Sequence, residues 1–333
     1  MATIPEPNNT LQGLIDAHYE KDQGRPRPHL GASLLGHPCD RWLWLSFRWA
    51  VVERFPGRIL RLFERGQREE ESIVSWLRAV GIEIHSTGGE QSRVDFGSHV
   101  SGSLDGIIEG GVPGAEKTRH VAEFKTHSLK SFNELKSKGV FEAKPQHYAQ
   151  MQAYMMGTGI DRALYVAVCK DNDEIYSERV RFDKAAAEQI IQRGKRIALT
   201  ERIPEPLSAD PSWWQCKFCA AHDFCFGSKT TKEINCRTCA HSTPMPNSTW
   251  TCARWGNAEI PLEEQYKGCA SHVLHPDLVP WQWEGGDENG FYAVYVIDGQ
   301  RVMNGEPDAH VFSSQELLHL PEDSFGEEEA IPF

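Results

Sequence analysis

Seven of the nine cysteines in this 333-residue chain are crowded into the segment from Cys216 to Cys269. In a reducing compartment, clustered cysteines bind metal more often than they form disulfides. The segment is also poor in apolar residues, so free thiols would leave it without a core to hold it together. We therefore expect this part of the chain to fold around bound metal.

The first group of cysteines is one ligand short of a tetrahedral site. Cys216, Cys219 and Cys225 follow a C-x2-C-x5-C spacing, whereas structural thiolate sites use four ligands. Of the two earlier cysteines, Cys169 ends an apolar segment and is predicted to be a small core residue, while Cys39 lies in a loop that enters a helix. Cys39 is therefore the predicted fourth ligand, and four thiolates suit either an iron–sulfur cluster or zinc.

The second group combines a C-x2-C pair with two later cysteines, a pattern typical of a structural Zn²⁺ site. His241 and His272 are nearby alternative ligands, and a second iron–sulfur cluster is a further alternative. The predicted zinc ligands are Cys236, Cys239, Cys252 and Cys269.

The rest of the chain alternates between helix-like and strand-like patterns. Apolar spacing predicts helices over 11–20, 40–49, 58–80, 144–156 and 184–200. Strands are predicted over 82–85, 93–96, 100–108, 120–126, 163–168 and 174–182, with a later hairpin of 291–297 and 301–303 around Asp298-Gly299. A helix, several strands, a helix and another strand predict an α/β fold with a mixed sheet flanked by helices.

Two acids and a lysine fall on the predicted strands. Asp105 ends one strand, and Glu123 and Lys125 lie two residues apart on the next, so both project from the same face, opposite Ala122 and Phe124. Charges on an otherwise apolar strand are explained by a metal ion. Carboxylates are the ligands of Mg²⁺, and a lysine beside them would orient the attacking water and offset phosphate charge.

Polar residues on two predicted helices extend this set. Glu70 precedes Ile73, Val74 and Leu77 by three, four and seven positions, so it shares the face that packs on the sheet, with Glu69 as an alternative. A carboxylate on that face is costly unless it is paired or binds metal. Gln150 and Tyr154 stack one turn apart on the later helix, where they would contact DNA or support the lysine.

In this order, Asp105, Glu123-Phe-Lys125 and Gln150-Met-Gln-Ala-Tyr154 resemble the RecB-like branch of the PD-(D/E)xK nucleases, and point to a phage or prokaryotic protein. Glu70 matches that branch in following Gly66 by four positions, although many members carry histidine there. The resemblance covers roughly residues 30–230. It implies a restriction-endonuclease-like fold and Mg²⁺- or Mn²⁺-dependent hydrolysis of DNA, commonly as an exonuclease in recombination, repair or phage replication. Metal binding by Glu70, Asp105 and Glu123, and catalytic roles for Lys125, Gln150 and Tyr154, are carried over from it.

The first cysteine group resembles the iron–sulfur nucleases of the same branch, such as AddB and the CRISPR-adaptation nuclease. There, one cysteine before the nuclease core joins three after it around a [4Fe–4S] cluster. The resemblance implies such a cluster at Cys39, Cys216, Cys219 and Cys225, with zinc as the less favoured occupant. Trp213, Trp214, Phe218 and Phe224 are predicted to shield the cluster, with stacking on single-stranded bases as an alternative.

We therefore expect four parts in the chain. An N-terminal extension covers 1–30, a nuclease core closed by the iron–sulfur cluster covers 31–230, a four-cysteine zinc-like module covers 231–283, and a small β piece with an acidic tail covers 284–333. The beginning of the chain has no basic stretch followed by an apolar one, and the apolar runs are short. These features predict a cytoplasmic protein without a membrane partner.

The net charge of −12 argues against a nucleic-acid partner when taken alone, because phosphates favour basic surfaces. The charge is uneven, however, since residues 116–144 are mainly basic and Pro321–Phe333 is purely acidic. DNA is the expected partner, together with a recombination or replication protein. Two alternatives are a non-catalytic nucleic-acid-binding protein on a degenerate nuclease fold and a scaffold whose acidic tail recruits a partner. A further possibility is that the acidic tail mimics DNA and occludes the site.

Overall fold

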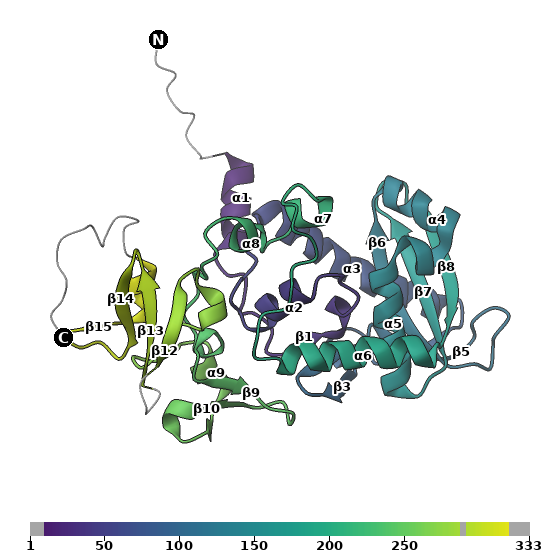
Figure 1. Ribbon diagram of the computed structural model, residues 1–333. Helices are drawn as coiled ribbons and strands as arrows, with labels where there is room; N and C mark the ends of the chain where they lie inside the picture. The colour runs from purple at the N-terminus through teal and green to yellow at the C-terminus, as the bar shows by residue number, and fades with distance from the viewer. Residues whose placement is uncertain (1–9, 287–290, 320–333) are drawn as a thin grey trace, which may run out of the picture.

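A mixed five-stranded sheet lies at the right of Figure 1. The structure, a computed structural model, describes residues 10–286 and 291–319, so the predicted acidic tail lies outside the described residues. The strand order is β2-β5-β6-β7-β8, and β6 and β7 are parallel while the other neighbours are antiparallel. This sheet confirms the predicted α/β class. Its strands are β2 (Glu83–His85), β5 (Gly106–Gly110), β6 (His120–His127), β7 (Arg162–Cys169) and β8 (Ile175–Arg181).

Helices cover both faces of this sheet. Ala122 and Phe124 of β6 pack with Ile73 and Val74 of α3 (Gly57–Ala79) on one face. On the other face, Val121 of β6 packs with residues of α4 (Leu129–Ala143) and α5 (Pro145–Thr158). Because side chains alternate along a strand, Glu123 and Lys125 belong to the face that α4 and α5 cover. The prediction that Glu123 and Lys125 project from the face opposite Ala122 and Phe124 is therefore confirmed.

The single strand predicted over 100–108 is wrong. The segment divides into β4 (Val100–Ser103) and β5, and the two belong to different sheets. Asp105 lies in the break, where its carboxylate accepts a hydrogen bond from the backbone of the neighbouring strand, so the chain turns there. β4 is the middle strand of a small sheet with β1 (Leu30–Gly31) and β3 (Arg93–Gly97).

Helix α4 was absent from the sequence prediction. Only Phe132, Leu135 and Val140 of its residues are buried, so the apolar pattern is too sparse to mark a helix. Gly139, with φ +74°, also interrupts the helix before its last turn. The helix lies against the sheet because those three apolar side chains reach the core that β6 and β7 share with α5.

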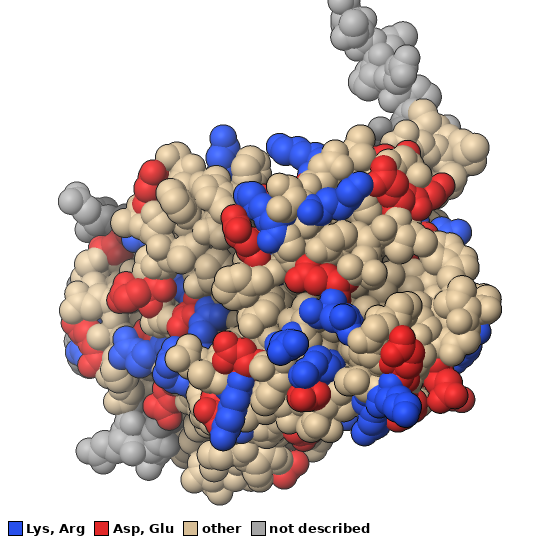
Figure 2. All heavy atoms as spheres, turned by 90° about the vertical axis from the view of Figure 1, so that its right-hand side faces the viewer, with Lys and Arg blue, Asp and Glu red and all other residues tan. Residues whose placement is uncertain are grey.

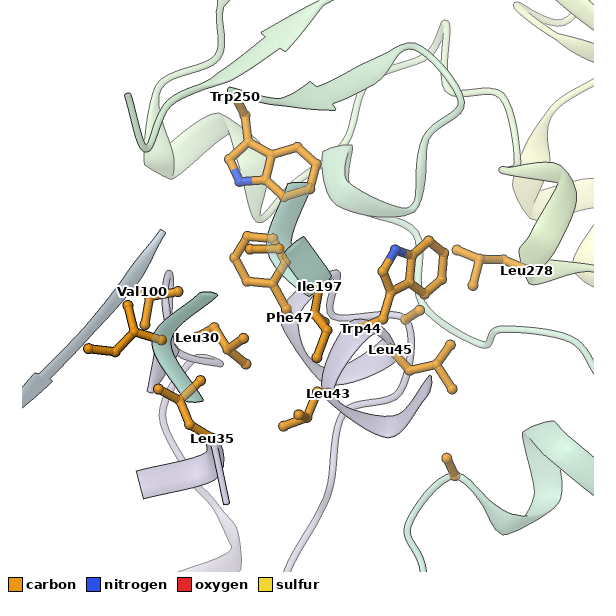
Figure 3. Packing of buried hydrophobic residues seen from close by; sticks show 14 of the residues in the cluster. Leu30, Leu35, Leu43, Trp44, Leu45, Phe47, Val100, Ile197, Trp250 and Leu278 are labelled. Carbon is orange, nitrogen blue, oxygen red and sulfur yellow. The ribbon is translucent and has the colours of Figure 1, made fainter. Parts of the chain in front are cut away.

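The largest core joins parts of the chain that are far apart in sequence (Figure 3). Leu43, Trp44 and Phe47 of α2 (Asp40–Phe47) pack with Ile197 of α6 (Lys184–Leu199) and with Trp250 from the cysteine-rich segment. The cysteine-rich segment therefore shares its core with the N-terminal half of the chain. The predicted boundaries between the four parts stay predictions.

Two smaller sheets complete the fold, one of them at the left of Figure 1. The turn at Asp298 and Gly299 connects β13 to β14 with positive φ at both residues, which confirms the predicted hairpin. Among the helices of the described ranges, none has the length and apolar character that a membrane crossing needs. The remaining strands are β9 (Ser242–Pro244), β10 (Trp250–Cys252), β11 (Ala258–Glu259), β12 (Gln282–Gly286), β13 (Tyr292–Ile297), β14 (Gln300–Gly305) and β15 (Val311–Phe312); the remaining helices are α1 (Leu11–Glu20), α7 (Trp214–Lys217), α8 (His222–Phe226), α9 (Leu262–Gln265) and α10 (Ser314–Leu318).

Candidate active site and thiol groups

Asp105, Glu123 and Lys125 meet where β5 begins beside β6. The Asp105 Oδ2 atom accepts a hydrogen bond of 2.8 Å from the backbone N–H of Phe124, which fixes the carboxylate to the neighbouring strand. Lys125 Nζ lies 3.6 Å from Asp105 Oδ2 and forms an ion pair with Glu123. It also donates a hydrogen bond of 2.9 Å to the Phe124 carbonyl. One ammonium group is therefore held between two carboxylates.

The Glu123 carboxylate is completely buried. Apart from the ion pair with Lys125, its oxygens receive no hydrogen bond from the described residues. Burial raises the pKa of Glu123 to about 8; Lys125 opposes this rise, and Asp105 adds to it. Burial alone would lower the pKa of Lys125, but the charges of Glu123 and Asp105 outweigh it and raise that pKa. A buried carboxylate with free lone pairs is a natural ligand for a cation.

Glu70 faces the same carboxylates from α3. Burial raises its pKa to about 7, the charge of Asp105 adds to the rise, and Lys125 opposes it. Glu70 and Glu71 both line the cleft that reaches Asp105, whereas Glu69, the alternative at this position, does not line it. The structure thus places Glu70 with Asp105 and Lys125.

Gln150 and Tyr154 of α5 line the same cleft. The Tyr154 hydroxyl donates a hydrogen bond of 2.7 Å to the Ser103 carbonyl, just before the turn that carries Asp105. Burial, with the nearby charges of Glu123 and Asp105, raises the pKa of Tyr154, so its hydroxyl stays protonated. This hydrogen bond ties α5 to the end of β4. Tyr154 therefore holds the backbone that presents Asp105.

The cleft has a volume of about 880 Å³ and carries both signs of charge. Glu70 and Asp105 lie on its wall together with Arg27 and Arg78. Among the described residues, neither arginine forms an ion pair with a carboxylate. Arg78 donates from one guanidinium nitrogen to the Ile84 carbonyl and to Thr87, which leaves its other N–H groups for an anion. No motif marked these arginines in the sequence, because only the fold brings them to the cleft.

A row of buried and half-buried polar side chains lies near Lys125. The Tyr165 hydroxyl of β7 is 2.8 Å from Nε2 of His127 and 2.9 Å from Nδ1 of His147, and Ser131 Oγ is 3.1 Å from Nδ1 of His127. Burial lowers the pKa of His127 to about 4 and that of His147 to about 3, and the charge of Lys125 contributes to both shifts. Both imidazoles are therefore neutral near pH 7. No local pattern in the sequence marks this row, because its members come from four separate elements.

The basic stretch 116–144 does not form a continuous positive surface. Figure 2 shows the face at the right of Figure 1, where Lys and Arg lie interspersed with Asp and Glu. Most of the basic residues of the stretch are paired with acids, which reduces their availability to phosphates. The pairs are Arg119 with Glu109, Lys125 with Glu123, Lys136 with Glu174, and Lys138 and Lys144 with Glu134.

The first four predicted thiol ligands line one small cavity of about 20 Å³. Cys39 is the N-cap of α2, and its Sγ accepts a hydrogen bond of 3.4 Å from Trp42 N. Cys219 Sγ likewise accepts one of 3.4 Å from Ala221 N. Cys169 lies fully buried in β7, which confirms its prediction as a core residue. The structure thus brings Cys39 to the cavity that Cys216, Cys219 and Cys225 line.

The predicted aromatic shield of this cavity is wrong. Trp213, Trp214 and Phe218 are 45 %, 64 % and 81 % exposed. Phe224 is buried, and none of the four lines the cavity. Trp42 and Phe226 line it instead, because α2 and α8 carry them beside the cysteines on the same elements.

The second four cysteines also gather in one region. Cys236 is close enough to Cys252 and Cys269, and Cys239 to Cys236 and Cys252, for their charges to interact. His272, an alternative ligand, uses Nδ1 toward Ser314 Oγ at 2.7 Å and Nε2 toward the Asn235 carbonyl at 3.1 Å. Both ring nitrogens of His272 already form hydrogen bonds, so the four thiols are better candidates for metal ligands than this histidine.

Within residues 10–286 and 291–319, no group of three or more His, Cys, Asp or Glu side chains is arranged to hold a metal ion as it stands. Any ion at the carboxylates or at either thiol group therefore requires side chains to close around it. Carboxylate and cysteine side chains do so by rotation about one or two bonds.

No family model matches the chain, and no curated protein matches it. Among solved structures, a protein named SSO0001 is similar with a TM-score of 0.40 and 14% identity, covering 66% of this chain and 98% of that one. An alkaline exonuclease from Laribacter hongkongensis, LHK-Exo, has a TM-score of 0.34 and 16% identity, with 52% and 87% covered. Its complex with dAMP has a TM-score of 0.36 and 15% identity, with 55% and 89% covered. At such low TM-scores these likenesses carry no weight for function, which has to be inferred from the side chains.

Proposed function

We propose that the chain is a Mg²⁺- or Mn²⁺-dependent DNA nuclease that hydrolyses phosphodiester bonds. The observation that carries the proposal is the meeting of Asp105, Glu123 and Lys125 in one ion-paired group, with Glu70 beside it at the wall of an open cleft. Burial and the neighbouring carboxylates raise the pKa of Glu70 to about 7 and that of Glu123 to about 8, and a bound divalent cation would hold both groups deprotonated as its ligands.

The donor set fits a hard cation. Asp105 and Glu123 would supply oxygen ligands, and Glu70 would supply a third from α3; Glu123 has lone pairs that no described residue uses. Mg²⁺ and Mn²⁺ accept such ligands and leave positions for water and phosphate. When bound, the ion supplies Lewis-acid chemistry and a more acidic water.

The remaining residues of the cleft have separate tasks. Lys125 would hold the attacking water and stabilise negative charge that develops on the phosphate. Gln150 and Tyr154 would keep α5 and the Asp105 turn in place, and Arg27 and Arg78 would bind the DNA backbone as anion ligands. A mixed cleft of this kind explains how an acidic protein would bind DNA: the positive charge is local.

The mode of action rests on the resemblance of Asp105, Glu123-Phe-Lys125 and Gln150–Tyr154 to the RecB-like nucleases. We infer exonuclease action on DNA ends during recombination, repair or phage replication, alongside a recombination or replication protein. Linear and covalently closed DNA of the same sequence separate this mode from endonuclease action, because only an endonuclease nicks the closed form.

A test of the function uses linear DNA with Mn²⁺, with EDTA, and with Asp105→Asn. The variant keeps an acceptor for the Phe124 N–H but loses the charge, so we expect cleavage to fall roughly 100-fold or more. Asp95→Asn is the matched control, because Asp95 Oδ1 also accepts a backbone N–H bond, of 2.8 Å from Gly97, outside the carboxylate group. DNA binding without any cleavage by the wild type would overturn the proposal and favour a non-catalytic binding protein.

We further propose a [4Fe–4S] cluster at Cys39, Cys216, Cys219 and Cys225. Support comes from the shared cavity, from the backbone N–H groups directed at Cys39 and Cys219, and from the resemblance to iron–sulfur nucleases. The thiols are poor ligands until deprotonated, since burial raises the pKa of Cys219 to about 11. The role would be structural, because joining Cys39 to Cys216 closes a long loop of the chain.

Anaerobically purified protein is therefore expected to be brown and to contain iron, and Cys219→Ser should lose both the colour and several degrees of melting temperature. Cys169→Ser is the control, because Cys169 is a buried thiol outside the cavity. Iron analysis and visible absorption check the result. Colourless protein that contains zinc in place of iron would contradict the iron–sulfur assignment.

A further inference from the structure

Tyr165 lies on the same face of the sheet as Glu123 and Lys125, one strand away. In the parallel pairing of β6 with β7, Tyr165 is the partner of Glu123, and Ala167 is the partner of Lys125. Partners in neighbouring strands point to the same side of a sheet, with their backbones about 4.8 Å apart. Tyr165 and Ala167 also belong to the buried cluster that contains Val121 of β6 and is covered by α4 and α5. The Tyr165 side chain therefore starts beside Glu123, in the layer that holds the carboxylate–lysine group.

The tyrosine side chain runs along the sheet toward the residue that follows Lys125 on this face. Side chains alternate along β6, so Lys125 lies between Glu123 and His127 on the face that α4 and α5 cover. The Tyr165 backbone is level with Glu123, yet its hydroxyl lies 2.8 Å from Nε2 of His127. At the level of Lys125, β7 carries only the small side chain of Ala167, which leaves room for the phenol ring. The phenol and the imidazole therefore meet beside Lys125 and close the β7 side of the space around it.

Hydrogen bonds hold the phenol ring in this position. The hydroxyl also lies 2.9 Å from Nδ1 of His147 on α5, and the Nδ1 atom of His127 lies 3.1 Å from Ser131 Oγ on α4. Tyr165 is fully buried, so a displaced hydroxyl would lose these partners without gaining water in their place. A strand and two helices thus fix the ring from different directions.

Lys125 depends on its surroundings to stay in place. Its ammonium group forms an ion pair with Glu123, lies 3.6 Å from Asp105 Oδ2 and donates to the Phe124 carbonyl at 2.9 Å. The lysine side chain is 25% exposed, and its stem is long and flexible, so these contacts alone leave it other orientations. A wall on the β7 side removes the orientations in which the stem tilts toward that strand.

We propose that Tyr165 is a positioning residue for Lys125: its ring and its hydrogen bonds with His127 and His147 keep the ammonium group directed at Asp105 and Glu123. Without the hydroxyl, the ring and the His127 imidazole separate, and Lys125 gains room to turn away from the carboxylates. The effect on DNA cleavage rests on the nuclease function proposed above. The placement of the ammonium group is a property of the free protein, so it is measured separately.

Tyr165→Phe tests the effect on cleavage, because it removes the hydroxyl and keeps the ring. We expect the single-turnover rate on linear DNA with Mn²⁺ to fall roughly 10-fold while the affinity for DNA stays unchanged. Tyr295→Phe is the matched control, since Tyr295 is equally buried and its hydroxyl donates to the Leu274 carbonyl in the C-terminal sheet. Wild-type cleavage by Tyr165→Phe, or an equal loss of cleavage in Tyr295→Phe, would overturn the proposal.

The reactivity of the Lys125 amine tests the placement without DNA or metal. Acetylation of each lysine by a small amine reagent is followed by mass spectrometry of peptides, with the surface residue Lys136 as the internal reference. We expect Lys125 to react several-fold faster in Tyr165→Phe than in the wild type and in Tyr295→Phe, and Lys136 to react equally in all three. If the wild type fails to cleave DNA, the nuclease function falls while this comparison still stands. Equal reactivity of Lys125 in Tyr165→Phe and the wild type would refute the positioning role.

Discussion

Replacing Lys125 by methionine is expected to lower the rate of DNA cleavage roughly 100- to 1000-fold, the effect of removing one group that stabilises charge in a transition state. Lys125 Nζ contacts both Asp105 and Glu123, so no other described cation can take its place there. Methionine keeps a stem of similar length and so preserves packing against the sheet. Single-turnover cleavage of linear DNA with Mn²⁺ measures the loss.

Two controls separate this effect from general damage. Lys136→Met removes a lysine that pairs with Glu174 on the surface, and we expect it to cleave normally. Binding of Mn²⁺ should be unchanged or tighter in Lys125→Met, because the carboxylates lose a competing cation. Cleavage that survives in Lys125→Met would show that Lys125 is only a structural partner of Glu123.

The stability of the protein is expected to fall steeply as the pH is lowered from about 6.5 to 4. Burial is the first cause of a depressed pKa at eight of the described histidines, and the shift is large at six of them, with smaller contributions from nearby charges. The pKa is lowered to about 4 for His29, His99, His127, His272 and His275, and to about 3 for His147.

The sign follows from proton binding. Below pH 6.5 these imidazoles take up protons in the unfolded chain but stay neutral in the folded protein until about pH 4. The unfolded state binds more protons in this range. The free energy of unfolding therefore decreases as the pH is lowered, by roughly 1.4 kcal/mol per pH unit for each such histidine. Urea unfolding between pH 7.5 and 4.5 measures this slope. His147→Gln should reduce it by about one proton, and a flat profile would contradict the expectation.

The sequence predicted those parts of the site that depend on local spacing. Glu123 and Lys125 face one way because they are two apart on a strand, and Glu70 faces the sheet because it lies one and two turns before apolar residues. Gln150 and Tyr154 follow from the same kind of argument. In each case, neighbours in the sequence decide the direction of the side chain.

Features that depend on long-range packing were not predictable in this way. Arg27 and Arg78 reach the cleft from separate elements, and the aromatic residues that line the first thiol cavity are Trp42 and Phe226. Helix α4 has too few buried residues to reveal its period. Nothing in the local pattern around Arg237 indicates that its side chain crosses to the carbonyls of Phe47 and Pro28.

The contacts of the Tyr165 hydroxyl link the tautomers of two histidines. A phenol carries a single proton, yet His127 and His147 both approach its oxygen. If the hydroxyl donates its proton to one imidazole, the other neutral imidazole must present N–H to the oxygen, and Ser131 follows the choice made at His127. The two rings consequently hold tautomers that depend on each other. A change of tautomer at one ring would therefore be felt at the others, so these four side chains form one connected polar unit near Lys125.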